Sequence, residues 1–212
     1  MEAQQHRRTI ASYVPPQAFA PRARAALRGL GYRVVPAATQ GRFDDASWKP
    51  DLRLVDAQHL DRLPAGESAG PIIVLAGGRT PELDDARVVG IALRPAAVGA
   101  LYPLIQRALE QTPRRAARAP AQIPARCSHA DRRWTGEVRS LSETGCLLRS
   151  PAEMALGLEF NLLFPLPLGR MVSTRARLVD RRKDQAGVVF CRPSAPVREA
   201  IADYVERRLA TL

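Results

Sequence analysis

Hydrophobic positions follow two different periods in the two halves of the chain. In the first half, short apolar runs alternate with segments whose apolar residues recur at helical spacing. One run, GPIIVLAGG (70–78), is apolar almost throughout, as in strands buried on both faces. In the second half, apolar and polar residues alternate with a period of two, as in strands with one buried face. The pattern therefore predicts an N-terminal α/β domain and a C-terminal all-β domain.

The N-terminal half is expected to form a parallel sheet with flanking helices. Strands that alternate with helices favour this arrangement, because each crossover then passes over a face of the sheet. Gly31 is expected to end the first helix. The predicted strands cover residues 9–14, 33–37, 51–57, 70–78 and 86–95, and the predicted helices cover residues 20–31 and 96–110.

The C-terminal half is expected to form a six-stranded antiparallel β-barrel followed by a helix. Six short strands at regular spacing are typical of a small barrel. The tail has one apolar stripe, which leaves open whether its helix packs on its own barrel or on a second copy in a homodimer. The stripe holds Val197, Ile201, Val205 and Leu209, and the predicted strands cover residues 122–128, 132–140, 146–150, 156–167, 171–182 and 186–191.

A segment rich in proline and arginine separates the halves. Pro113, Pro120 and Pro124 interrupt any helix or central strand there. We therefore divide the chain into an α/β domain (1–110), a linker (111–125), and a barrel with its C-terminal helix (126–212).

The basic charge is concentrated after the first domain. The net charge is +11, of which residues 1–112 carry +3 and residues 113–212 carry +8. Of the 32 basic residues, 30 are arginine, whose planar fork suits phosphates. We therefore expect an anionic ligand or partner for the C-terminal half.

Several classes of protein do not fit the sequence. Cys127, Cys146 and Cys191 lack metal-binding or redox spacing, which favours buried thiols in a reduced, cytoplasmic protein. The N-terminus lacks the apolar region of a signal peptide, and no apolar run reaches about 18 residues, so no membrane insertion is expected. No catalytic set of Ser, His, Asp or Cys and no phosphate-binding glycine loop stands out. We therefore expect a protein that is not an enzyme and has no metal or cofactor.

The first domain has two signatures, PDLRLVDA and ALRP, in strands of suitable order and length. Over about residues 8–110 it resembles a response-regulator receiver domain, with Asp56 at the phosphoacceptor position and Arg94 at the lysine of the Lys-Pro signature. The acidic pair that holds Mg²⁺ in that family is absent, and Ala76 replaces a hydroxyl residue. Phosphoryl transfer depends on such a metal. The resemblance therefore implies a pseudo-receiver used for contacts, whose vestigial phosphoacceptor Asp56 hydrogen-bonds a neighbour such as Arg94.

Two motifs mark the second domain. RRAAR lies in the linker, and SLSETG lies at the turn between two predicted strands. With the strand pattern and the final helix, they resemble a PilZ domain, the bacterial module known for binding cyclic di-GMP, from about residue 114 to residue 212. The resemblance implies a cyclic di-GMP site made of Arg114, Arg115, Arg118, Ser140, Ser142 and Gly145.

These residue types suit that ligand. Arginine makes charge-assisted bonds to phosphate and pairs with guanine O6 and N7. The turn offers hydroxyl and backbone N–H groups, and Gly145 permits a positive φ and close approach of the ligand. Ser140 stands at the family's Asp/Asn position. Losing a charged acceptor there is expected to weaken binding about five- to tenfold.

The sequence thus favours a cyclic di-GMP receptor in which ligand binding at the linker–barrel junction reorients the pseudo-receiver and controls a downstream protein partner. One alternative is a ligand-independent adaptor, in which the arginines form a solvated linker and SLSETG is an ordinary hairpin turn. A nucleic-acid-binding regulator is a second alternative. It is suggested by the +8 charge but not favoured, since a helix-turn-helix pattern is lacking and aromatic residues are few. A phosphorylated regulator is disfavoured by the missing acidic pair.

Overall fold

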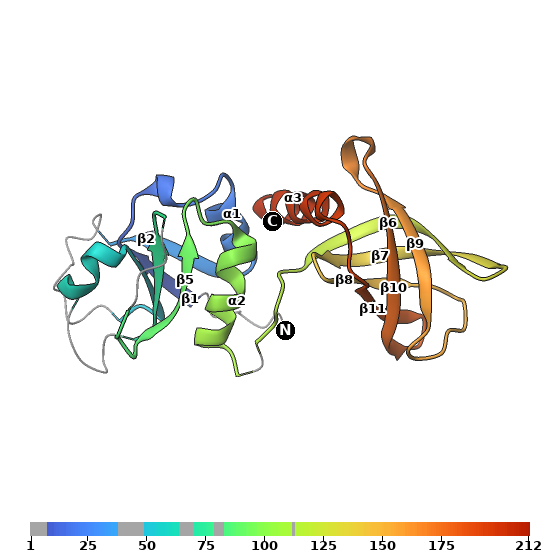
Figure 1. Cartoon of the computed structure of the whole chain (residues 1–212), viewed down its shortest axis with the longest axis horizontal. Coiled ribbons are helices and arrows are strands. Elements are labelled where there is room, and N and C mark those ends of the chain that lie inside the picture. Colours follow the sequence, from blue (N-terminus) through green and yellow to red (C-terminus); the bar gives the residue numbers. More distant parts are fainter. Residues whose placement is uncertain (1–7, 38–48, 64–69, 79–82, 112) are drawn as a thin grey trace, which may run out of the picture. The chain divides into compact units, whose positions relative to one another are not determined.

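The computed structural model of the chain describes residues 8–37, 49–63, 70–78, 83–111 and 113–212 (Figure 1). The chain divides into two compact units. One comprises Met1–Arg115 together with Leu209–Leu212, and the other comprises Ala116–Arg208. Within the described residues, no helix has the length and apolar character needed to cross a bilayer.

The N-terminal unit contains a five-stranded parallel sheet. Its strand order is β2-β1-β3-β4-β5, the order of flavodoxin-like doubly wound folds. The central strands β3 and β4 are buried at every position, as the apolar run of β4 predicts, and β3 buries Arg53 as well. The strands are β1 (Arg8–Ser12), β2 (Tyr32–Pro36), β3 (Leu52–Val55), β4 (Ile72–Ala76) and β5 (Val88–Leu93).

Two α-helices flank this sheet. Helices α1 (Ala23–Gly29) and α2 (Val98–Leu109) contact each other, so they lie on the same face. Gly31 has a φ of +92°, which lets the chain turn from α1 into β2. Short 3-10 helices, η1 (Pro16–Ala18) and η3 (Ala57–Arg62), follow β1 and β3. The predicted parallel sheet with flanking helices is confirmed.

The second unit is a closed barrel, and this prediction is also confirmed. Its strand order is β10-β11-β8-β7-β6-β9, and neighbouring strands pair antiparallel. Along β10, buried and exposed side chains alternate as the sequence predicts. The strands are β6 (Ala119–His129), β7 (Arg132–Ser142), β8 (Gly145–Arg149), β9 (Glu159–Pro165), β10 (Met171–Arg182) and β11 (Gln185–Phe190).

The barrel begins earlier than the sequence suggests. Strand β6 starts at Ala119, three residues before the predicted strand 122–128, so the barrel includes residues 119–125 of the segment that we assigned to the linker. Strand β6 pairs with β9 over Arg126 to Ser128. Pro120 and Pro124 therefore lie where β6 pairs only with β7, and a proline there need not remove a ladder hydrogen bond.

The aromatic residues of the barrel are mostly core residues. Phe160 and Phe164 are buried, and Phe164 stacks on Phe190 with ring centroids 6.4 Å apart. The ring of Trp134 packs against that of Phe160, with ring centroids 5.5 Å apart, and Trp134 is partly exposed. The chain ends in α3 (Ala195–Ala210), where Ile201, Val205 and Leu209 are buried and Val197 is half-buried.

Candidate ligand-binding site

The SLSETG motif forms the turn between β7 and β8. Ser142 and Gly145 pair across the hairpin, and Glu143 and Thr144 connect them. Ser142 is fully buried, and its Oγ donates a hydrogen bond of 2.9 Å to the carbonyl oxygen of Gly145. The Phe190 backbone N–H donates to the Thr144 carbonyl at 3.0 Å, which attaches the turn to β11. The Ser142 hydroxyl therefore stabilises the turn itself.

Gly145 is required by packing. Gly145 does not adopt the positive φ that a glycine permits. A Cβ atom at this position would lie 2.1 Å from the carbonyl oxygen of Val188 and 3.1 Å from its carbonyl carbon. Glycine is needed because the backbones of β8 and β11 approach closely where the barrel closes.

Ser140 lies beside an irregularity in β7. The register shifts between Val138, which pairs with Leu148, and Ser140, which pairs with Leu147, so Arg139 has no partner residue in β8. Such bulges turn a neighbouring side chain away from the regular alternation. Ser140 is partly exposed. The position can therefore offer a hydroxyl group to a ligand at this turn.

The register between β6 and β7 brings the two motifs together. Ala119 pairs with Leu141 and Pro120 pairs with Ser140, so Arg118, just before β6, lies at the level of the SLSETG turn. Burial raises the pKa of the Cys146 thiol to about 12, and the charge of Arg118 opposes this rise. Four of the predicted site residues thus gather at one end of the barrel: Arg118, Ser140, Ser142 and Gly145.

The other two arginines of the motif belong to the N-terminal unit. Arg114 and Arg115 are exposed, and the division between the units falls directly after Arg115. The Arg114 backbone N–H donates to Oε1 of Gln106 at 3.0 Å. Gln106 is buried on α2, and its Nε2 donates to the Tyr32 hydroxyl at 2.6 Å. The start of the linker is therefore anchored in the N-terminal unit, and the RRAAR motif is shared between the two units.

Glu143 is a charged residue of this turn that the sequence analysis did not select. Burial raises the pKa of its carboxyl group, and the positive charge of Arg198 on α3 opposes that rise. Its carboxyl group lies in the same hairpin as Ser140, where the family motif has its acid or amide. One feature of the sequence could have identified Glu143. It is an acidic residue at a variable position of the SLSETG motif, in which Ser140 replaces the usual Asp or Asn.

Asp56 forms the ion pair that the sequence predicts. It follows β3, and its Oδ2 accepts a hydrogen bond of 2.5 Å from Nη2 of Arg94, which follows β5. Burial raises the pKa of Asp56, but the bonds from Arg94 and from the Gln58 backbone N–H outweigh it and lower the pKa below its usual value. Within the described residues, no group of three or more His, Cys, Asp or Glu is placed to hold a metal ion.

This ion pair predicts a pH-dependent stability difference. A carboxyl group whose pKa is lowered by folding stabilises the folded state above its unfolded pKa and loses that effect as the pH falls through the folded pKa. Arg94→Met should therefore destabilise the N-terminal sheet by about 1.5–3 kcal/mol at pH 7. The difference should shrink as the pH falls below 3.8, the usual value for aspartate. Hydrogen exchange of β3 and β5 amides measures it, with Arg94→Lys as the charge-preserving control. A difference that does not change with pH would contradict the role of Asp56.

Comparisons with known proteins agree with the geometry of the second unit. The model of the PilZ domain family matches residues 112–207. No curated protein matches the chain. The family match does not reach the N-terminal sheet.

Three solved structures illustrate the similarity. The inhibitor of motility MotI/DgrA of Bacillus subtilis is 16% identical, with 46% of this chain and 51% of that chain covered and a TM-score of 0.41. The PilZ domain of YcgR from Escherichia coli, solved with c-di-GMP, is 18% identical over 45% of this chain and 90% of that chain, with a TM-score of 0.38. A tetrameric PilZ protein of Xanthomonas campestris is 22% identical over 51% of this chain and 52% of that chain, with a TM-score of 0.23. The chain spans about half the length of the first of these proteins. Its own C-terminal half, residues 112–207, is a PilZ domain.

Proposed function

We propose that this chain is a cyclic di-GMP receptor whose ligand binds between the linker arginines and the β7–β8 turn. The observation that carries the proposal is the convergence of the two motifs, since Arg118 lies at the level of Ser140 and Ser142. An exposed guanidinium group beside a turn with hydroxyl and backbone N–H donors can bind a phosphate and the edge of a guanine. Arg114 and Arg115 would complete the site from the linker.

Ligand binding would couple the two units. The Arg114 backbone is anchored to Gln106 of α2, whereas Arg118 leads directly into β6. A ligand that holds both guanidinium groups would therefore order the linker and reorient the N-terminal unit. Ordering of a segment by phosphate contacts is an established mode of switching. The reoriented unit, used as a pseudo-receiver, would then present or hide a surface for a downstream protein partner.

A ligand-independent adaptor is the second candidate function, and two contacts favour it. The Ser142 hydroxyl is already used inside the turn, and Gly145 is required by the neighbouring strand. Two residues of the second motif therefore have structural roles that need no ligand. In an adaptor, the barrel would serve as a scaffold, and no affinity for cyclic di-GMP would be expected.

Calorimetric titration with cyclic di-GMP separates the two candidates, with Ser140→Asp and Ser140→Ala as companion variants. In a receptor, the wild-type protein binds saturably. Ser140→Asp should bind about five- to tenfold more tightly, since a carboxylate accepts guanine N–H bonds as a charged partner. Ser140→Ala should bind no more tightly than the wild type. If neither the wild type nor Ser140→Asp binds, the receptor proposal fails and the adaptor is favoured.

A further inference from the structure

Two rows of outward-facing side chains cross the strands β7, β6, β9 and β10, away from the SLSETG turn. In the first row, Ser128 pairs with Arg133 of β7 on one side and with Asn161 of β9 on the other. In the second row, Arg126 likewise lies between Thr135 and Leu163. Residues directly opposite each other on neighbouring strands lie on the same face of the sheet, and neighbouring strands are about 4.8 Å apart. The rows therefore form one continuous surface, which is polar apart from Leu163.

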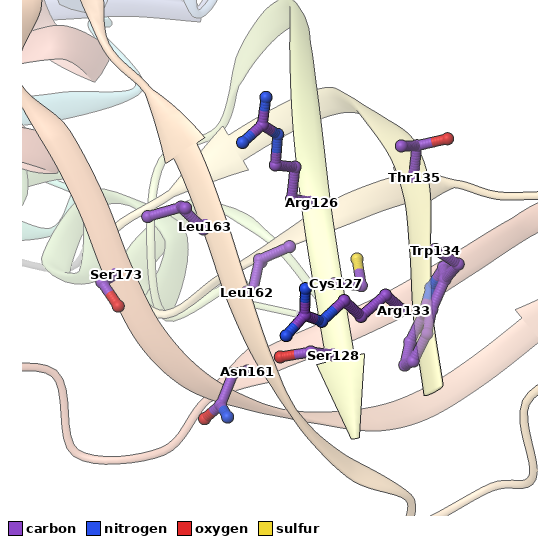
Figure 2. Close-up of a pocket in the computed structure, with 10 residues that line it drawn as sticks. All are labelled: Arg126, Cys127, Ser128, Arg133, Trp134, Thr135, Asn161, Leu162, Leu163 and Ser173. Atoms are coloured by element: carbon purple, nitrogen blue, oxygen red, sulfur yellow. The ribbon is translucent and has the colours of Figure 1, made fainter. Parts of the chain in front are cut away.

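This surface is hollowed into a groove of about 720 Å³ (Figure 2). In Figure 2, Arg133 extends from β7 across β6 toward Ser128 and Asn161, whereas the guanidinium group of Arg126 points away from that of Arg133. Trp134, which pairs with the buried Cys127 and packs on Phe160, borders the groove from the inner face of β7. Volumes of about 300–1,000 Å³ are typical of small-molecule sites, so the groove can hold a ligand of nucleotide size.

The groove is rich in hydrogen-bond donors and has no acid. None of its lining residues is aspartate or glutamate. Within the described part of the chain, the side chains of Arg126 and Arg133 make no ion pair or hydrogen bond. The guanidinium group of Arg133, an amide and three hydroxyl groups thus line a groove whose lining residues include no acid, and Arg126 lies at its edge.

We propose that this groove binds a phosphate-bearing small molecule of about nucleotide size, at a site separate from the cyclic di-GMP turn. Arginine binds phosphate oxygens through two parallel N–H bonds, and Ser128, Asn161 and Ser173 add neutral donors around them. The groove begins at Arg126, whereas the turn lies opposite Ala119 and Pro120. At about 3.3 Å per residue, the two sites are roughly 20 Å apart along β6. The groove therefore does not depend on the proposed receptor function.

Calorimetry with pyrophosphate, ATP and citrate tests the site and its chemistry. Pyrophosphate and ATP should bind the full-length protein saturably, and citrate, a carboxylate of similar charge, should bind much more weakly. Arg126→Ala/Arg133→Ala should weaken binding of both phosphates by about 10- to 100-fold. The matched control is Arg170→Ala/Arg177→Ala, which removes the same charge from exposed arginines outside the groove and should bind like the wild type.

Two further readouts locate the ligand. With Trp48→Phe as background, Trp134 is the sole tryptophan, and pyrophosphate should change its emission. Cyclic di-GMP affinity should be unchanged in Arg126→Ala/Arg133→Ala, so failure of this proposal is distinguishable from failure of the receptor proposal. The absence of saturable phosphate binding, equal losses in the two double variants, or citrate binding as tight as that of pyrophosphate would each overturn the proposal.

Discussion

Replacing Arg114 and Arg118 together with alanine is expected to weaken cyclic di-GMP binding by at least about 100-fold. Each arginine would contribute a hydrogen bond between charged groups, worth about 1.5–3 kcal/mol. The loss of two such bonds corresponds to a loss of affinity of about 100-fold or more. The backbone bond from Arg114 to Gln106 does not involve the guanidinium group, so the variant should keep its anchored linker. Calorimetry of the purified full-length protein measures the loss.

The control for this variant is Arg170→Ala/Arg177→Ala, which lowers the net charge equally and should keep wild-type affinity. If both double variants lost affinity to the same extent, general electrostatic attraction would explain the binding, and the motif would have no specific role. Small-angle scattering provides a second readout. Saturating ligand should change the profile of the wild type and leave that of Arg114→Ala/Arg118→Ala unchanged. Identical wild-type profiles with and without ligand would refute the reorientation.

The second large effect is expected at Gly145. Replacing glycine by alanine often stabilises a protein by about 0.4–1 kcal/mol, because it restricts the unfolded chain. At Gly145 the added Cβ would lie 2.1 Å from a backbone oxygen of β11, and a backbone atom in a closed barrel has little room to move. Overpacking of this kind costs about 1–3 kcal/mol or more. We therefore expect Gly145→Ala to destabilise the barrel by about 2 kcal/mol or more.

Denaturant unfolding followed by the emission of Trp134 measures this loss in the barrel, again with Trp48→Phe as background. The control is Gly77→Ala, where no atom lies within 4 Å of the added Cβ and φ is not positive, so stability should change little. The experiment also separates two explanations for the glycine at position 145, which are packing against β11 and close approach of the ligand. A Gly145→Ala protein with wild-type stability and no cyclic di-GMP binding would show that the ligand, and not β11, requires glycine.

Short-range patterns were sufficient to predict the elements of both units. The period of two along β6 and β10 and the apolar run of β4 reflect which faces are buried, and burial acts on each strand separately. The pair between Asp56 and Arg94 was also predictable, because the carboxyl ends of parallel strands meet at one edge of a sheet. The two motifs could be identified because each is contiguous.

The roles of individual site residues depend on contacts between distant segments. Gly145 needs its small size because of Val188, a residue of another strand. Ser142 uses its hydroxyl within the turn, and Arg114 is attached to Gln106 on a different element. The arginines of the groove carry no motif, and only the register of four strands brings them to one face.

The sequence alone therefore determined the α/β and all-β halves, the barrel followed by a helix, and the two motifs with their order. Each of these follows from local periodicity or from a few adjacent residues. Only the tertiary structure decided where the barrel begins, why Gly145 is glycine, how the RRAAR motif is shared between the units, and that a donor-rich groove exists. These properties depend on strand register and barrel closure, which arise from pairing between residues far apart in the chain.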